Sequence, residues 1–175
     1  MWSSLPGAKS EDPATIFRCG QLSNAGKIAL GTHQIVSQAT RLCFNIKGNT
    51  NNWDEAIIPY PCGNSTNMQF YFVDQGSGLY SIHTVNGTQD LCLNISTAAS
   101  SPGDGKKYGG PGNLIQWSCS ASFDNELFKL VDLGRGRQQI RVKNSGLCLE
   151  DPGSGGTIRQ NVCSSSPNQI FTLTK

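Results

Sequence analysis

The sequence predicts a single all-β domain that contains three copies of one structural unit. A short cysteine-centred motif occurs three times, as Leu42-Cys43-Phe44-Asn45, Leu91-Cys92-Leu93-Asn94 and Leu147-Cys148-Leu149-Glu150. A unit of about fifty residues cannot bury a hydrophobic face by itself, so three copies must share one core. The chain of 175 residues is 37% apolar and contains 20 glycines and 8 prolines, which is typical of one loop-rich β domain.

Each copy is predicted to contain strands on both sides of its cysteine motif. Residues 33–36, 80–83 and 139–142 precede the motifs as short alternations of apolar and polar side chains. A closing signature follows in each copy, as Met68-Gln69-Phe70-Tyr71, Asn125-Glu126-Leu127-Phe128 and Asn168-Gln169-Ile170-Phe171. Strands at 71–73, 128–130 and 171–173 then place an aromatic and an aliphatic side chain on one face.

These elements divide the chain into an arm and one domain. We expect an extended N-terminal arm over residues 1–25 and a single domain over 26–175. Within the domain the three repeats are predicted to span about residues 30–78, 79–135 and 136–175. The turn formers between residues 100 and 112 predict a long loop in the second repeat.

The charge and hydropathy of the chain exclude two classes of partner. A net charge of +2 with 15% charged residues leaves no concentrated basic stripe, so nucleic acid is not expected as a partner. Arg135-Gly136-Arg137 is interpreted as a basic hairpin turn. No apolar run is long enough to enter a membrane as a span. The N-terminus lacks a basic segment followed by an apolar stretch, so we expect the signal peptide of a secreted protein to be absent from this sequence.

Cysteine usage indicates an oxidising, extracellular environment. Disulfides within the repeats are the simplest pairing, namely Cys43 with Cys62, Cys92 with Cys119 and Cys148 with Cys163. None of these cysteines has Cys-x-x-Cys spacing and His33 and His83 stand alone, so neither a metal nor a cofactor is expected. Cys19 is left over, and it is either free or paired with a partner chain, which the N-terminal arm could also contact.

The triple recurrence of these motifs resembles the ricin-type β-trefoil lectins. The resemblance rests on the Cys-Leu-Asp-like strand, the aromatic residue two positions before the second cysteine, and the closing Asn-Gln-x-aromatic signature, over about residues 30–175. It implies twelve strands in six hairpins with pseudo-threefold symmetry. It also implies up to three shallow sugar sites, one per repeat, with galactose-type glycans as partners.

Strand geometry predicts where the sugar sites lie. If each disulfide joins two directly opposed residues, side chains two positions away on each strand share its face. Asn94 should then lie beside Trp117, and by the same construction Asn45 beside Tyr60 and Glu150 beside Asn161. An aromatic ring beside a polar amide suits a sugar, because the ring packs on the C–H face while the amide binds hydroxyls.

The family resemblance assigns three roles in each repeat. Ricin-type sites have an aspartate where this chain has Asn45, Asn94 and Glu150, a stacking aromatic where it has Tyr60, Trp117 and Asn161, and an asparagine where it has Met68, Asn125 and Asn168. Asp151 could replace Glu150 if the strand bulges there. The middle repeat keeps the most features, so the sites are expected in the order middle, first, third. The competing interpretation places Trp117 and Tyr60 in packing roles and Asn125 and Asn168 in turns.

Three sequons add a constraint on the middle site. Asn64, Asn86 and Asn94 each begin an Asn-x-Ser/Thr triplet and are candidate glycan acceptors in a eukaryotic secretory pathway. A glycan on Asn94 would block the site that is expected to be strongest.

The sequence predicts a binding protein rather than an enzyme. It contains no phosphate-binding loop, no Gly-x-Ser-x-Gly elbow and no His-Glu-x-x-His, and neither histidine is expected to pair with a nucleophile. Two functions therefore remain. The first is a lectin module, free-standing or the glycan-binding subunit of a toxin. The second is a protein-interaction trefoil with vestigial sugar pockets, acting in toxin assembly or resembling a protease inhibitor.

Overall fold

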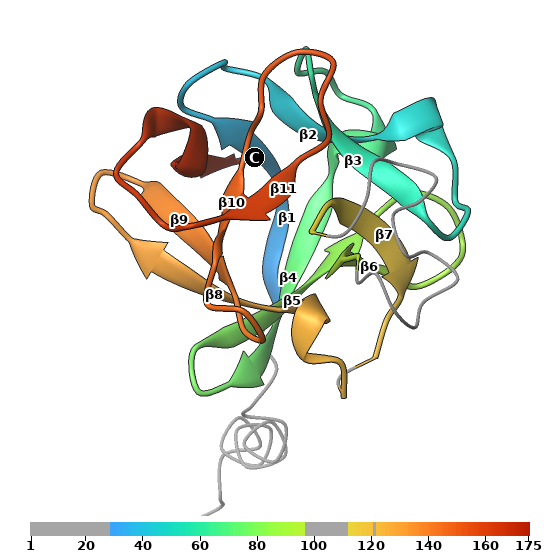
Figure 1. Ribbon diagram of the computed structural model, residues 1–175. Helices are drawn as coiled ribbons and strands as arrows, with labels where there is room; N and C mark the ends of the chain where they lie inside the picture. The colour runs from blue at the N-terminus through green and yellow to red at the C-terminus, as the bar shows by residue number, and fades with distance from the viewer. Residues whose placement is uncertain (1–28, 97–111, 121) are drawn as a thin grey trace, which may run out of the picture.

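The computed structural model describes residues 29–96, 112–120 and 122–175, which form twelve β-strands (Figure 1). The predicted arm with Cys19, and most of the predicted loop at 100–112, lie outside the described residues. The strands are β1 Ala29–Ser37, β2 Cys43–Ile46, β3 Glu55–Tyr60, β4 Phe70–Gly76, β5 Leu79–Thr84, β6 Leu91–Ile95, β7 Leu114–Ser118, β8 Leu127–Asp132, β9 Arg137–Val142, β10 Cys148–Glu150, β11 Arg159–Asn161 and β12 Phe171–Thr174.

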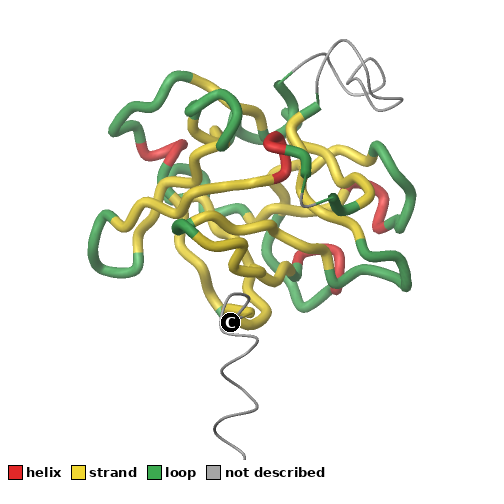
Figure 2. Tube along the Cα trace, turned by 90° about the horizontal axis from the view of Figure 1, so that it is seen from below, coloured by secondary structure: helices red, strands yellow, loops and turns green. Residues whose placement is uncertain are grey.

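Six of the strands close into a ring. Antiparallel pairing runs from β1 to β4, β5, β8, β9 and β12, and β12 pairs with β1 again. The remaining strands form the hairpins β2–β3, β6–β7 and β10–β11, one per repeat. The three hairpins also contact one another: the Ile158 N–H donates to the Ile57 carbonyl and the Leu114 N–H to the Ile158 carbonyl. The tube view of Figure 2 shows mainly strands with short helical turns between them; in the described part of the chain these turns are η2 Lys47–Asn49, η3 Thr66–Met68, η4 Asp124–Glu126 and η5 Pro167–Gln169. The all-β trefoil prediction is confirmed.

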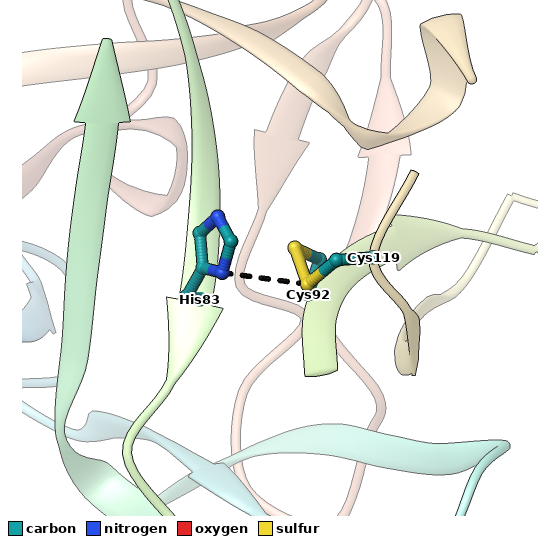
Figure 3. Close-up of side chains that lie close together, drawn as sticks. All are labelled: His83, Cys92 and Cys119. Atoms are coloured by element: carbon teal, nitrogen blue, oxygen red, sulfur yellow. Dashed lines mark hydrogen bonds between the residues drawn. A yellow bond between two sulfur atoms is a disulfide. The ribbon is translucent and has the colours of Figure 1, made fainter. Parts of the chain in front are cut away.

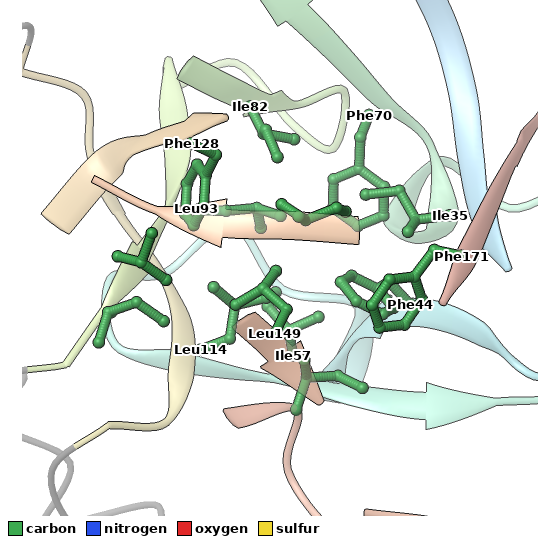
Figure 4. Packing of buried hydrophobic residues seen from close by; sticks show 14 of the residues in the cluster. Ile35, Phe44, Ile57, Phe70, Ile82, Leu93, Leu114, Phe128, Leu149 and Phe171 are labelled. Carbon is green, nitrogen blue, oxygen red and sulfur yellow. The ribbon is translucent and has the colours of Figure 1, made fainter. Parts of the chain in front are cut away.

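The hydrophobic core repeats itself three times. Buried side chains occupy equivalent positions in each copy: Ile35, Ile82 and Ile140; Phe44, Leu93 and Leu149; Ile57, Leu114 and Ile158; and Phe70, Phe128 and Phe171 (Figure 4). Phe44 and Phe171 join the first and last repeats through an edge contact with 5.1 Å between ring centroids. Each repeat therefore contributes matched residues to one shared core, as the repeat period predicts.

Three disulfides close the repeats as predicted. Cys43 is bonded to Cys62, Cys92 to Cys119 and Cys148 to Cys163, at sequence separations of 19, 27 and 15. In the chain-entropy model each loop of this size stabilises the fold by roughly 3 kcal/mol. No helix among the described residues is long and apolar enough to cross a membrane.

The closing signature of the first repeat was predicted one residue too late. The peptide N–H groups of Gln38, Val85 and Lys143 donate to the carbonyls of Ile170, Gln69 and Leu127, which makes these three carbonyl residues equivalent. Asn67, not Met68, is consequently the counterpart of Asn125 and Asn168. Likewise Phe70, not Tyr71, corresponds to Phe128 and Phe171. The chemical identity of Gln69 and Tyr71 suggested the wrong alignment, whereas backbone hydrogen bonds define the correct one.

Candidate functional site

The predicted neighbours do not stand directly opposite each other. Cys92 lies opposite Trp117 and Asn94 opposite Ile115. The first and third repeats have the same offset, since Asn45 lies opposite Ile58 and Glu150 opposite Arg159. The second cysteine of each pair follows the strand end, as Cys119 follows β7, so the disulfide bridges diagonally. The assumption of directly opposed cysteines was therefore wrong by two residues.

In the middle repeat, Asn94 belongs to a buried polar cluster instead of an open site. Its side chain is only 4% exposed. Asn94 Nδ2 donates to Glu126 Oε1 at 2.9 Å, and Asn94 Oδ1 accepts from Asn125 Nδ2 at 3.1 Å. Asn125 also donates to the Ile95 carbonyl, as Asn67 does to the Ile46 carbonyl. These asparagines hold the chain of their own repeat, which is the turn-stabilising role weighed above.

Glu126 completes this cluster and has a perturbed pKa. The side chain is 1% exposed, and Oε2 accepts from the Ser120 N–H at 2.7 Å. Burial raises the pKa of the Glu126 carboxyl, and the hydrogen bonds from Asn94 and Ser120 oppose that rise without cancelling it. The sequence indicated Glu126 only as part of the closing signature, and its pairing with Asn94 was missed.

Trp117 lies half-buried against a tryptophan of the first repeat. The ring centroids of Trp117 and Trp53 are 5.3 Å apart and the rings are tilted by 49°. Trp53 is 52% exposed, and its Nε1 donates to Gln89 Oε1 at 3.2 Å. Trp53 precedes β3, which pairs with β7 through Glu55 and Gln116, so the contact between repeats depends on tertiary pairing. Sequence reasoning missed Trp53 because it lies in a different repeat.

In the third repeat, the carboxylate is fully occupied by protein donors. Glu150 Oε1 accepts from Arg159 Nε and Nη2 at 3.1 and 2.8 Å. Glu150 Oε2 accepts from Asn161 at 3.0 Å and from Gln169 at 3.1 Å, so Glu150 and Asn161 do meet as predicted, along a diagonal. Burial would raise the pKa of Glu150, but these hydrogen bonds and the charge of Arg159 outweigh burial and lower it.

Asp151 and Asn168 also serve the fold of the third repeat. Asp151 Oδ2 accepts from the Thr40 hydroxyl at 2.6 Å, while Oδ1 accepts from the Gly153 N–H at 2.8 Å. The Asp151 N–H donates to the Asn168 carbonyl. Asp151 is therefore not a replacement for Glu150, and it ties the third repeat to the first.

A hollow of the first repeat lies beside Tyr60. Tyr60 is 52% exposed and lines a cavity of about 540 Å³. Leu42, Lys47, Ile58, Pro59 and Pro61 line the hollow around that ring, together with the loop 154–157 that connects β10 to β11. Asn45, its predicted partner, is buried and does not line the hollow. The tyrosine thus faces a loop of the third repeat, which sequence reasoning did not identify.

A family comparison agrees with this architecture. The model of the ricin-type beta-trefoil lectin domain matches residues 31–171. The chain belongs to this family. The match covers all three repeats, and together with three disulfides it indicates an extracellular lectin domain.

Solved structures share the fold of this lectin domain at low sequence identity. A designed threefold-symmetric protein, ThreeFoil, is 24% identical with a TM-score of 0.69, covering 82% of this chain and 98% of that one. An exo-beta-1,3-galactanase from Clostridium thermocellum is 22% identical with a TM-score of 0.69, covering 83% of this chain but only 30% of that one. A ricin B-like lectin from Macrolepiota procera, solved with lactose, is 15% identical with a TM-score of 0.59, covering 83% and 95%. A search of curated sequences found no match.

One cluster of the lectin domain has the composition of a metal site but not its chemistry. His83 lies within 4.8 Å of the sulfur atoms of Cys92 and Cys119 (Figure 3). Those sulfurs are bonded to each other, and a metal requires thiolates. The cluster is therefore a histidine packed on a disulfide.

We expect Asn64 to be the one sequon of the lectin domain that carries a glycan in the folded protein. Asn64 is exposed, whereas Asn86 is buried and donates from Nδ2 to the Thr50 carbonyl at 2.9 Å. The Nδ2 atom of Asn94 is likewise occupied by Glu126. A glycan is attached through this nitrogen, so glycans on Asn86 or Asn94 are incompatible with these contacts. Peptide mass mapping after expression in a eukaryotic secretory pathway should find occupancy at Asn64 alone. Folded protein with a glycan on Asn94 would contradict the described cluster.

Proposed function

We propose that this lectin domain is a carbohydrate-binding module whose principal site is the hollow beside Tyr60. The observation that carries the proposal is an exposed aromatic ring on the wall of a cavity of about 540 Å³. Sugar C–H faces pack on such rings, and hydroxyls require nearby polar groups. Ser154 and Thr157 hydroxyls and the peptide groups of Gly155 and Gly156 supply these polar groups across the hollow. The order of sites expected from sequence is thereby changed, with the first repeat ahead of the middle one.

The apolar and polar parts of the hollow suit a sugar of galactose type, and Lys47 also lines it. Its walls combine an apolar side formed by Tyr60 and two prolines with a glycine-rich loop, and such a surface matches a pyranose with one apolar and one polar face. The similar lectin solved with lactose supports the galactose class. Ile58 in the first repeat is the counterpart of Arg159 in the third repeat. The first repeat therefore lacks the arginine–glutamate pair that occupies the corresponding place in the third repeat.

The tryptophan pair provides a second, weaker sugar platform. Trp53 is exposed and tilted against Trp117, so the pair presents an aromatic surface beside the amide of Gln89. Both polar atoms of that amide are engaged, since Gln89 Nε2 donates to the Asn51 carbonyl at 3.2 Å. We therefore propose lower affinity here than beside Tyr60.

The Tyr60→Ala variant should weaken sugar binding by about 30-fold or more, the effect of losing an aromatic hot spot worth about 2 kcal/mol. Binding of lactose and galactose-terminated glycans is measured on a glycan array and by calorimetry. Tyr60→Phe keeps the ring and should retain most of the affinity, and Val162→Ala, at a side chain 72% exposed on another repeat, should change nothing. The melting temperature of all three variants should equal that of the wild type.

Three other outcomes separate the alternatives. If Trp117→Ala or Trp53→Ala abolishes binding and Tyr60→Ala does not, the principal site lies at the tryptophan pair. If the folded protein binds no glycan, the lectin function is wrong and a protein-interaction role, such as assembly of a toxin, takes its place. If binding is found, we propose that the domain targets a larger complex to glycans, since a trefoil also forms part of a longer chain in the galactanase.

A further inference from the structure

The middle repeat differs from the other two at one position on the ring of strands. Gln34 in β1 and Gln139 in β9 each donate a side-chain amide to the carbonyl of the residue after the second cysteine, Gly63 and Ser164 respectively. The equivalent residue in β5 is Ser81, because Ile35, Ile82 and Ile140 are equivalent core positions. Serine is too short to make this contact. A hollow of about 210 Å³ lies there, lined by Ser81, His83, Ser120 and the disulfide Cys92–Cys119.

The serine that lines this hollow belongs to a chain of hydrogen bonds with a single consistent direction. Gln75 Nε2 donates to Ser81 Oγ at 2.8 Å. Ser81 Oγ lies 2.9 Å from His83 Nε2, and His83 Nδ1 lies 2.7 Å from Asp90 Oδ1. In the neutral ring, donation from Nδ1 to the Asp90 carboxylate leaves Nε2 to accept the proton of Ser81. Sequence reasoning did not identify this contact between His83 and a serine hydroxyl.

The histidine ring is held in this orientation by contacts on two sides. Tyr71 stacks on His83 with ring centroids 4.8 Å apart and 22° between the planes. On another side, His83 Nδ1 lies 3.4 Å from Cys119 Sγ, as the dashed line in Figure 3 shows. The disulfide therefore places the loop that carries Ser120 beside the ring. A nucleophile, a base and an orienting carboxylate thus occupy the relative positions that activate a serine.

We propose that Ser81 is an activated nucleophile that reacts with small acyl esters in the hollow of the middle repeat. Ser81 Oγ forms a bond to the ester carbonyl carbon while its proton passes to His83 Nε2. The tetrahedral adduct then breaks its bond to the alcohol oxygen, which leaves with the proton from His83. A water molecule next attacks the acyl-serine and gives its proton to His83 Nε2, and collapse of this adduct returns that proton to Ser81 Oγ and releases the carboxylic acid. Asp90 is a positioning residue and keeps the ring in the required tautomer.

The dimensions and donors of the hollow limit the substrate and the rate. A volume of about 210 Å³ accepts a short acyl group and excludes a long chain. Gln75 Nε2 is one polar N–H donor beside the reacting oxygen. Efficient acyl transfer uses preorganised donors for the developing oxyanion, so acylation by reactive esters and slow turnover are expected.

The test is covalent labelling of the folded, disulfide-bonded protein with a fluorophosphonate probe. Ser81 Oγ forms a bond to phosphorus and fluoride leaves, so intact mass reports one added group and peptide mapping reports its position. We expect labelling at Ser81, none after Ser81→Ala, and a rate at least about 100-fold lower after His83→Gln, the usual contribution of a general base. Ser165→Ala removes an exposed hydroxyl of the third repeat, outside this hollow, and should label as the wild type does.

Two further measurements keep the test decisive. Ser81→Gln restores the residue type found in the other two repeats, so this variant should fold, with three disulfides and an unchanged melting temperature, and should not react. p-Nitrophenyl acetate should give a burst of about one nitrophenolate per chain with wild type and none with Ser81→Gln. Labelling no faster than that of the denatured protein, or labelling that survives Ser81→Ala, would overturn the proposal.

Discussion

Replacing Phe171 by alanine should lower the free energy of unfolding by about 3–5 kcal/mol, the usual cost of truncating a fully buried phenylalanine. The ring is completely buried and contacts Phe44 of the first repeat. Its strand, β12, pairs with both β1 and β9, so the side chain stabilises the closure of the ring where the ends of the domain meet.

Urea unfolding followed by circular dichroism measures this loss. Val162→Ala is the control, since that side chain is largely exposed and should change stability by less than about 0.5 kcal/mol. A loss below about 1 kcal/mol for Phe171→Ala would show that β12 is not part of the shared core.

The donor role of Asn94 and the acceptor role of Glu126 should be exchangeable only when both residues are changed. Glu126 accepts from Asn94 Nδ2 and from the Ser120 N–H, so two donors need two acceptor oxygens. Glu126→Gln supplies one oxygen and one amide nitrogen and should cost about 1–3 kcal/mol. Asn94→Asp combined with Glu126→Gln should recover most of that loss, because the carboxylate introduced at position 94 would accept from the amide introduced at position 126 and from Asn125.

In the third repeat the donor and acceptor of the corresponding pair are already exchanged. Gln169 Nε2 donates to Glu150 Oε2 at 3.1 Å, and Gln169 Oε1 accepts from the Ser164 N–H at 2.7 Å. Ser164 follows Cys163 as Ser120 follows Cys119. A double-mutant cycle by urea unfolding measures the coupling between residues 94 and 126. Additive single-mutant effects would contradict the described pairing.

The pH dependence of stability provides a second readout of Glu126. Its pKa in the folded state is raised by burial, so folding favours the protonated carboxyl. The stability contributed by this group is complete below the unfolded-state pKa and is lost as pH rises through the folded-state pKa. Glu126→Gln cannot titrate, so the decline in unfolding free energy over this interval should be smaller than in the wild type. An unchanged pH profile would show that Glu126 does not contribute.

The repeat, the all-β class, the three disulfides and the trefoil family could all be predicted from the residues alone. These properties follow from local patterns that recur in one chain: alternation sets the face of each strand, and paired cysteines have few alternative partners within a repeat. The core followed too, because the same positions of each copy are apolar and must meet at one centre.

Which candidate residues contact one another, and which are exposed, depends on how the three repeats pack together. The strand offset moved Asn94 away from Trp117 and into contact with Glu126. Tyr60 meets a loop of the third repeat, and Trp117 meets Trp53 of the first. Ser81 and His83 face a common hollow because the middle repeat has a serine where the other two repeats have a glutamine. Contacts between repeats depend on register and burial, and neither quantity is encoded in the spacing of residues along a single strand.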